Sequence, residues 1–186
     1  GDTKLVFAPN FDTSGANSLY GMFRDCINLT TVPVLNTATV ENMGSMFQGC
    51  SSLKELVLFD TSNVTVMGHM FHNCGLLQTI PQFNTSKVTL MDSMFNKCIN
   101  LVTIPVLDVS NVTSTQQMFL GCSNLKSVEL NTVSATKMKS MFQDCKALIT
   151  ANIKTDSATD VSEMFKHCEV LKSLPLLNFA NVTNLS

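Results

Sequence analysis

The sequence predicts an α/β solenoid, a right-handed curved stack of about seven to eight short repeats that forms a single domain over residues 1–186. Three observations lead to this fold class. The pair Met-Phe recurs along the chain, a cysteine follows each pair at a fixed offset, and a leucine follows each cysteine three residues later. The step between pairs is first 24 and then 23 residues, because the pairs begin at Met22, Met46, Met70, Met94, Met118, Met141 and Met164.

The strand segment of each repeat begins at the recurring leucine. Leu125-x-x-Val128-x-Leu130 has the Leu-x-x-Leu-x-Leu frame of a leucine-rich repeat, and the segment that begins at Leu148 follows the same frame. The 24-residue spans insert one residue, and most of them also place a proline inside the frame. Proline has no N–H to donate to a sheet. We therefore expect very short parallel strands that stop at Pro33, Pro81, Pro105 and Pro175.

A polar turn and a short helix are expected to complete each repeat. The turn is rich in Asp, Thr and Ser, and Thr65 is placed to cap a helix start. Met67, Met70, Phe71 and Cys74 then stand at i, i+3, i+4 and i+7, the spacing of one apolar helix face. Helices need more room than strands, so we expect strands on the concave face and helices on the convex face of the stack.

The seven cysteines are expected to be free thiols in the core. Each occupies the same slot between apolar positions. Neighbouring slots lie close together, but their Cβ vectors would run parallel, whereas a disulfide requires them to converge. The recurring methionines could suggest an adaptable binding face, but their fixed pairing with Phe and Cys favours core packing.

Composition excludes several classes of protein. The net charge of −2 lacks the basic field of a nucleic-acid-binding protein, and no apolar run is long enough to insert into a membrane. No nucleophile elbow or phosphate loop is present, so we expect no enzymatic activity and no cofactor. His69 and His72 stand close to Cys74, but the cysteine belongs to the buried face and the histidines to outward slots. We therefore expect no metal site.

The repeat resembles a known family. From Asp60 to Cys74 the chain reads Asp-Thr-Ser-Asn-Val-Thr-Val-Met-Gly-His-Met-Phe-His-Asn-Cys, and Met-Phe-x-x-Cys-x-x-Leu recurs through most of the sequence. This pattern is similar to the BspA-like leucine-rich repeats of bacterial and protist surface proteins. The resemblance implies a non-enzymatic protein, secreted or at the cell surface and often linked to adhesion, and it carries over no set of ligand residues. Thr115, Ala151 and Asn152 depart from the pattern.

The candidate binding surface is the outward side of the concave strands, formed by the third and fifth positions of the frame. It combines a row of hydroxyls with a partly apolar row, but it lacks the Tyr, Trp and Arg anchors of strong interfaces. Threonine also suits any solvated strand, so a purely structural role is the alternative. The candidate residues are Thr31, Glu55, Val57, Thr79, Thr103, Ser127, Glu129, Thr150, Asn152 and Ser173.

Two functional hypotheses follow. In the first, the chain is an interaction or adhesion module of the cell surface that binds a protein or glycan of a host, its matrix or a neighbouring cell. In the second, it is a structural spacer or stalk that presents another module. Neither terminus offers an obvious polar cap, so we expect the ends to fray or to self-associate, end to end or side by side, and the chain to be a segment of a longer surface protein.

Overall fold

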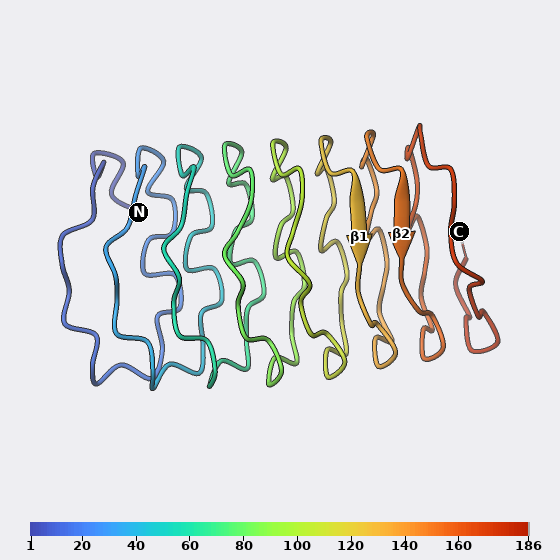
Figure 1. Cartoon of the computed structure of the whole chain (residues 1–186), viewed down its shortest axis with the longest axis horizontal. Helices are drawn as coiled ribbons and strands as arrows, with labels where there is room; N and C mark the ends of the chain where they lie inside the picture. Colours follow the sequence, from blue (N-terminus) through green and yellow to red (C-terminus); the bar gives the residue numbers. More distant parts are fainter. Residues whose placement is uncertain (186) are drawn as a thin grey trace.

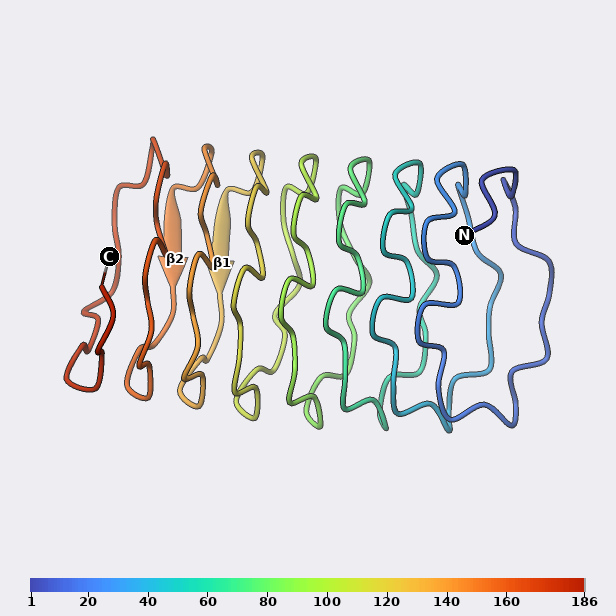
Figure 2. The same cartoon turned by 180° about the vertical axis from the view of Figure 1, so that it is seen from behind.

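The structure, a computed structural model that describes residues 1–185, is one row of short coils (Figure 1). Neighbouring coils are joined by parallel backbone bridges. On one side the bridges run in a continuous series from Ser18↔Asn42 to Asp160↔Asn184. Figure 2 shows the same row from behind, with the coils still side by side in chain order. The predicted solenoid of stacked coils is therefore confirmed. Among the described residues, no helix has the length and hydropathy needed to cross a membrane.

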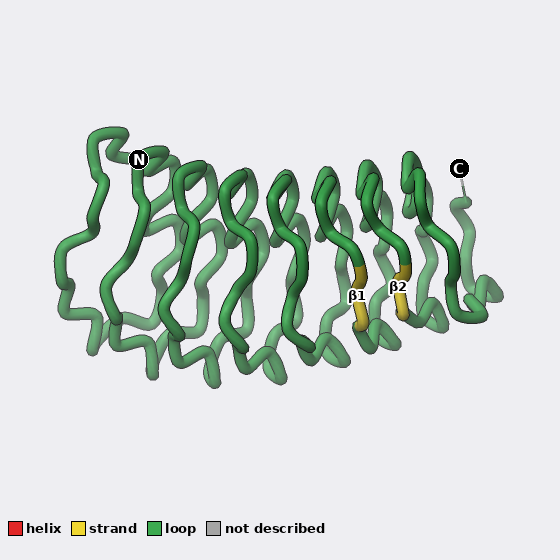
Figure 3. The backbone as a smooth tube through the Cα atoms, turned by 45° about the horizontal axis from the view of Figure 1, so that its top comes forward, coloured by secondary structure: helices red, strands yellow, loops and turns green. Residues whose placement is uncertain are grey.

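Two short strands form on the opposite side of the coils. Strand β1 (Ser127–Glu129) pairs in parallel with β2 (Thr150–Asn152), with Val128 opposite Ala151 (Figure 3). Both belong to the shorter spans, whose frame contains no proline. The strand segments of the other described coils form at most isolated bridges, such as Phe7↔Thr31. This pattern agrees with the expectation that proline and the inserted residue interrupt the ladder.

The predicted helical segments are wrong, because residues 1–185 contain no helix. Successive β-turns replace them. The N–H of Met70 donates to the carbonyl of Met67 (3.2 Å), and the N–H of Cys74 donates to the carbonyl of Phe71 (3.0 Å), three residues back in each case. The intervening N–H of Phe71 donates instead to the carbonyl of Met94 in the next coil, at 2.9 Å. From residue 67 to residue 74, three backbone N–H groups close turns and four donate to the next coil.

Left-handed residues explain why no helix forms. His69 and Asn73 have φ angles of 58° and 62°, and they immediately precede Met70 and Cys74. A helix cannot continue through such residues, whereas a chain of turns requires them. Thr65 caps no helix, because its Oγ1 hydroxyl donates to the carbonyl of Glu41 in the preceding coil at 3.3 Å.

The expected curvature loses its physical cause once the helices are absent. The side of the coils that carries the turns is hydrogen-bonded from coil to coil, so it does not have to splay to make room for wide helices. The row in Figure 1 accordingly bends little. We call the side that carries the predicted candidate residues the strand face, since it is not visibly concave.

The core is a continuous spine of stacked side chains. Consecutive phenylalanine rings lie 5.5–5.7 Å apart between centroids, with planes within 12° of parallel. The cysteines are free thiols, as predicted, and all but the half-buried Cys168 are buried. Burial raises the pKa of Cys98 to about 12, so this thiol keeps its proton at neutral pH. The stacked rings are those of Phe23, Phe47, Phe71, Phe95, Phe119, Phe142 and Phe165.

Candidate functional site

The structure places the ten predicted candidate residues on the strand face. Eight are exposed, and Val57 and Thr150 are half-buried. Parallel pairing sets Thr150 between Ser127 and Ser173. Glu129 lies opposite Asn152 in the same pairing. The other five candidates lie in coils with no strand, so the pairing does not join them to this group: Thr31, Glu55, Val57, Thr79 and Thr103.

A row of apolar side chains on the same segments is even more exposed. Val34, Leu58, Val106 and Leu176 have 75%, 62%, 68% and 101% of their surface exposed. They occupy the extra residue that the longer spans insert into the frame. The sequence interpretation treated that insertion as a bulge and did not assign its side chain to the surface. The inserted Val or Leu was the signal that could have identified this row.

A shallow hollow of about 680 Å³ opens where the longer spans give way to the shorter ones. We call it the junction hollow. Val106 comes from a coil with the inserted residue, and Glu129 comes from the next coil, the first without it. Phe83, Thr85 and Asp108 also line the hollow. The space therefore forms at a local mismatch between two repeat lengths.

Carboxylates and amides surround the junction hollow. Asp108 Oδ1 accepts hydrogen bonds from the hydroxyl (2.6 Å) and the N–H (3.0 Å) of Ser110. These two bonds lower the pKa of Asp108, so its carboxylate is ionised at neutral pH. Gln82 Nε2 donates to the carbonyl of Val106 at 2.8 Å. In the described part of the chain, neither Asp108 nor Glu129 forms an ion pair.

Thr85 is an exception within a row of buried threonines. In the equivalent slot, Thr61 donates its hydroxyl to the carbonyl of Asn84 in the next coil at 2.9 Å. Thr85 is equally buried, at 2% exposure, but its Oγ1 has no partner among residues 1–185. A buried hydroxyl without a partner costs about 1–3 kcal/mol. The threonines that make the bond are Thr13, Thr37, Thr61, Thr132 and Thr155.

The histidine pair lies outside the strand face. The rings of His69 and His72 are 5.8 Å apart, and burial, followed by the charge of His69, lowers the pKa of His72. Cys74 points into the core and donates its thiol to the carbonyl of Phe47 at 3.1 Å. The described residues bring together no group of three His, Cys, Asp or Glu side chains that could hold a metal ion. The absence of a metal site stays a prediction.

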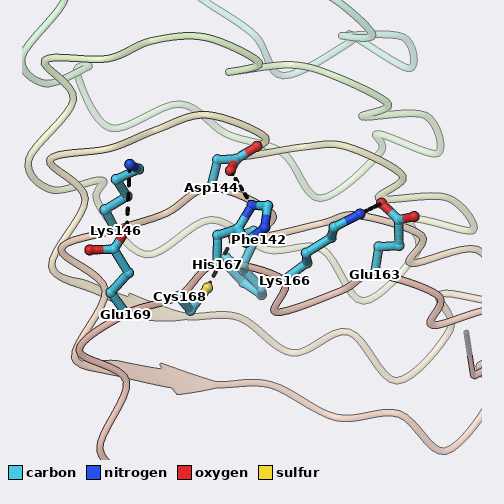
Figure 4. Close-up of polar contacts among 8 residues, drawn as sticks. All are labelled: Phe142, Asp144, Lys146, Glu163, Lys166, His167, Cys168 and Glu169. Carbon is cyan, nitrogen blue, oxygen red and sulfur yellow. Dashed lines mark hydrogen bonds and ion pairs between the residues drawn. The ribbon is translucent and has the colours of Figure 1, made fainter.

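The charged side chains near the end of the row differ from those at the junction hollow. Figure 4 shows the thiol of Cys168 on the carbonyl of Phe142 (3.1 Å) and the ion pairs around it. These pairs satisfy their carboxylates internally, although at such exposure each contributes little to stability. The pairs are Asp144 with His167 (2.7 Å), Glu163 with Lys166 (3.4 Å) and Glu169 with Lys146 (3.4 Å).

Comparison with known structures supports the fold. The Leucine Rich Repeat protein of T. pallidum shares 19% identity with this chain over 90% of it and 77% of that protein, with a TM-score of 0.62. A leucine rich cell surface protein from Faecalibacterium prausnitzii A2-165 (15% identity, 82% and 74% coverage, TM-score 0.35) is a more distant match. So is a leucine-rich repeat protein from Bacteroides ovatus ATCC 8483 (17% identity, 97% and 70% coverage, TM-score 0.32).

Sequence comparisons identify the family. A search among curated proteins gives no match. The family described as "Mycoplasma protein of unknown function, DUF285" matches residues 7–104 and 99–186. These two matches cover nearly the whole chain and follow the same repeats that build the coils. The protein therefore belongs to this family of repeat proteins, and its fold is that of a leucine-rich repeat.

Proposed function

We propose that this chain is a non-enzymatic interaction module of a secreted or cell-surface protein, and that it binds a partner protein or glycan through the strand face. One observation carries the proposal: the apolar row of Val34, Leu58 and Val106 is more than 60% exposed on one side of the coils. Exposed apolar side chains that lie in register, surrounded by polar residues, are typical of binding surfaces. In this proposal the apolar side chains contact the partner, and the neighbouring hydroxyls form hydrogen bonds with it.

The rigidity of the scaffold favours binding. The stacked phenylalanines support the strand face from the core, and hydrogen bonds between coils hold the opposite side of the row. A surface that is ordered before binding loses little conformational entropy when a partner docks. Leu58 is exposed, whereas the next residue, Phe59, is only 2% exposed. Phe59 therefore anchors in the core the segment that carries Leu58 on its surface.

The spacer function is the second candidate. It is favoured by the composition, because the chain has no tryptophan and one tyrosine, and these residues dominate the energetics of most interfaces. A spacer would need no ligand of its own. It predicts that substitutions on the strand face leave every binding property of the full-length protein unchanged.

A matched set of variants tests the proposal. The chain is immobilised and screened against extracellular-matrix proteins and a glycan array, and each partner is then measured with two variants. The first carries Val34→Ser, Leu58→Ser and Val106→Ser. The control carries Leu90→Ser and Ile99→Ser, which replace exposed apolar side chains (40% and 49%) outside the strand segments.

We expect the strand-face variant to lose at least about tenfold in affinity, or about 1.4 kcal/mol, while the control binds as the wild type does. Thermal unfolding of both variants establishes that they are folded. A screen with no partner above background would count in favour of the spacer function. Equal binding by both variants would place the contact elsewhere on the molecule.

End-to-end contact between copies of the chain belongs to the same proposal. A second apolar hollow of about 550 Å³ lies at the end of the row, lined in part by Phe165, Leu177 and Phe179. A second copy could cover it with its first coil, where Phe11 is 40% exposed. Light scattering tests this contact, since Phe179→Ser should shift an oligomer to the monomer, and a wild type that is monomeric at high concentration would exclude it.

A further inference from the structure

We propose that an acidic peptide segment of the partner protein binds beside the start of strands β1 and β2, where an apolar hollow opens among three lysines. This inference rests on the proposed function, and it commits this contact to a protein. We call the site the lysine hollow, and its volume is about 510 Å³. It is lined in part by Lys126, Lys146, Ala147, Ile149, Val170 and Lys172.

The charge around the lysine hollow is positive. Three of the 12 lysine and arginine side chains line it, although the chain as a whole carries a net charge of −2. The carboxylate of Glu169 lies 3.4 Å from Lys146, and both side chains are more than half exposed. Lys126 and Lys172 form no ion pair with any residue that the structure describes. Carboxylates of a partner would therefore complement this charge, which favours association and selects the partner.

Backbone register places the two unpaired lysines on either side of an apolar residue. The N–H of Ile149 donates to the carbonyl of Lys126 (2.8 Å), and the N–H of Lys172 donates to the carbonyl of Ile149 (3.0 Å). Two such steps along the row separate the lysines by about 10 Å. In an extended peptide, acidic residues two positions before and after a central apolar residue point to its side and lie about 13 Å apart. The flexible lysine stems can span the difference.

The floor of the hollow departs from a polar rule of the repeat. The residue before the recurring leucine is often an asparagine that donates its side-chain N–H to the preceding coil, as Asn28 and Asn100 do at 2.6 and 2.8 Å. Ala147 and Val170 occupy this slot in the lysine hollow, and their side chains cannot donate. Leu76 also departs from the rule, but the row beside it holds one lysine over three coils.

This departure brings no burial in exchange for the lost hydrogen bond. Val170 remains 45% exposed, and Ile149 beside it is 40% exposed. A local rule that is broken without a structural gain is typical of a functional site. An apolar side chain of the partner would cover both residues. A sulfated sugar fits less well, because its charged groups would lose water against an apolar floor and no aromatic side chain of the described residues lines the hollow for stacking.

Hydroxyl groups connect the lysine hollow with the strand face. Ser127 and Ser173 directly follow Lys126 and Lys172, and both are exposed. Parallel pairing places Thr150 between the two serines. A peptide that lies along the three coils can therefore place its acidic side chains on the lysines and its backbone groups near the candidate hydroxyls.

Three synthetic peptides test the inference on the full chain. Each is a capped heptapeptide of alanine with substitutions at the second, fourth and sixth positions. The first carries glutamate, leucine and glutamate, the second replaces both glutamates with glutamine, and the third replaces the leucine with alanine. A heparin-derived tetrasaccharide represents the alternative ligand, an anionic glycan. Binding is followed by chemical-shift changes in the amide spectrum of the isotope-labelled protein.

The protein variants form a matched set. Lys126→Gln with Lys172→Gln removes two charges from the hollow. The control, Lys54→Gln with Lys154→Gln, removes two exposed lysines that lie outside the hollow and form no ion pair among the described residues. Ile149→Ser removes the apolar side chain between the lysines. Thermal unfolding establishes that each variant is folded.

We expect the glutamate peptide to bind with a dissociation constant of about 1 mM or tighter, and the glutamine peptide at least about fourfold more weakly. The variant of Lys126 and Lys172 should lose at least about fourfold as well, because two exposed ion pairs contribute only modestly. Ile149→Ser and the peptide without leucine should each weaken binding at least about threefold, since both remove buried apolar surface. The lysine control and Ile99→Ser, which replaces an exposed apolar side chain elsewhere, should bind as the wild type does.

Three results would overturn the inference. One is equal binding of the glutamate and glutamine peptides. Another is a glutamate peptide that shifts no amide near the hollow at about ten times the expected dissociation constant. The third is a tetrasaccharide that binds more tightly than the peptide and depends on Lys126 and Lys172, which would assign the hollow to a glycan.

The two proposals can fail separately. A partner from the screen that depends on Leu58 but binds the variant of Lys126 and Lys172 normally would uphold the proposed function and reject the acidic contact. A partner that depends on both would support both. Binding of the glutamate peptide that is the same in the lysine variant and in the wild type would reject the inference whatever the screen returns.

Discussion

Replacing Phe71 with alanine tests whether the aromatic spine holds the coils together. Phe71 is fully buried and stacks on Phe47 and Phe95, with 5.7 Å between centroids on each side. Truncating a buried phenylalanine costs about 3–5 kcal/mol through lost burial and the cavity that remains. Each stacking contact contributes a further ~0.5–1.5 kcal/mol. We therefore expect a loss near the upper end of that range for Phe71→Ala.

Phe165 provides the internal comparison. It is only half-buried, and its one stacking partner in the spine is Phe142, at 5.5 Å. Phe165→Ala should cost about half as much as Phe71→Ala, because it loses one stacked neighbour and less buried surface. The contrast between the two variants follows from position alone, since both substitutions remove the same atoms.

Urea denaturation followed by far-ultraviolet circular dichroism measures both losses, and the lack of tryptophan makes fluorescence less suitable. In a solenoid each repeat is stabilised by its neighbours, so a central break should also broaden the transition or divide it in two. An equal loss of stability in the two variants, or a cost of Phe71→Ala below about 1 kcal/mol, would refute the idea of a continuous spine.

Three further predictions use the same denaturation assay. Burial raises the pKa of Cys98 from 9.0 to about 12, so this thiol ionises at lower pH in the unfolded chain than in the folded one. The free energy of unfolding should not depend on this group below pH 9 and should fall between pH 9 and about 12. Cys98→Ala should make that fall shallower. Thr61→Val should cost about 1 kcal/mol, because it removes a hydrogen bond, whereas Thr85→Val should be close to neutral or stabilising; equal costs would contradict the assignment of the unpartnered hydroxyl. Gly49→Ala should cost roughly 1–2 kcal/mol, because its φ of 76° is left-handed, whereas Gly15→Ala meets open space and should change little; the reverse order would refute this account.

The repeat and its core could be predicted from the sequence because they depend on spacing alone. Met70, Phe71 and Cys74 recur at fixed intervals, and a fixed interval in a solenoid places the same side chain at the same depth in each coil. Their complete burial follows from that rule. The parallel course of the thiols, and hence the absence of disulfides, follows from it as well.

The helices could not be excluded by spacing, because a helix and a series of β-turns both bring residues three and four apart to one side. Backbone conformation distinguishes the two. The residue before each cysteine is left-handed, and at Gly49, Asn73 and Gly121 it is of a type that adopts this conformation readily. That recurring Gly or Asn was a signal against a helix, although Lys97 and His167 weaken it in other repeats.

The candidate site was predictable only in part. Alternation along the strand frame correctly indicated that residues such as Thr103 and Ser127 are exposed. The junction hollow could not be predicted in the same way, because it arises between two coils whose lengths differ by one residue. The missing hydrogen bond of Thr85 could not be predicted either, because its side chain is the same as that of Thr61, which makes the bond.

Irregularity in the repeat is what makes the surface of this scaffold differ from coil to coil. A uniform solenoid satisfies each hydroxyl and carbonyl through the next coil, so its surface is periodic and offers many equivalent weak contacts. Removing one residue per span lets β1 and β2 pair, and it interrupts the row of inserted apolar side chains between Val106 and Leu176. Among the described residues, Asp108 and Glu129 form no ion pair at the first of these boundaries. Inserting a valine after Glu129 to restore the longer span should therefore close the junction hollow and separate β1 from β2, while the spine and its stability remain.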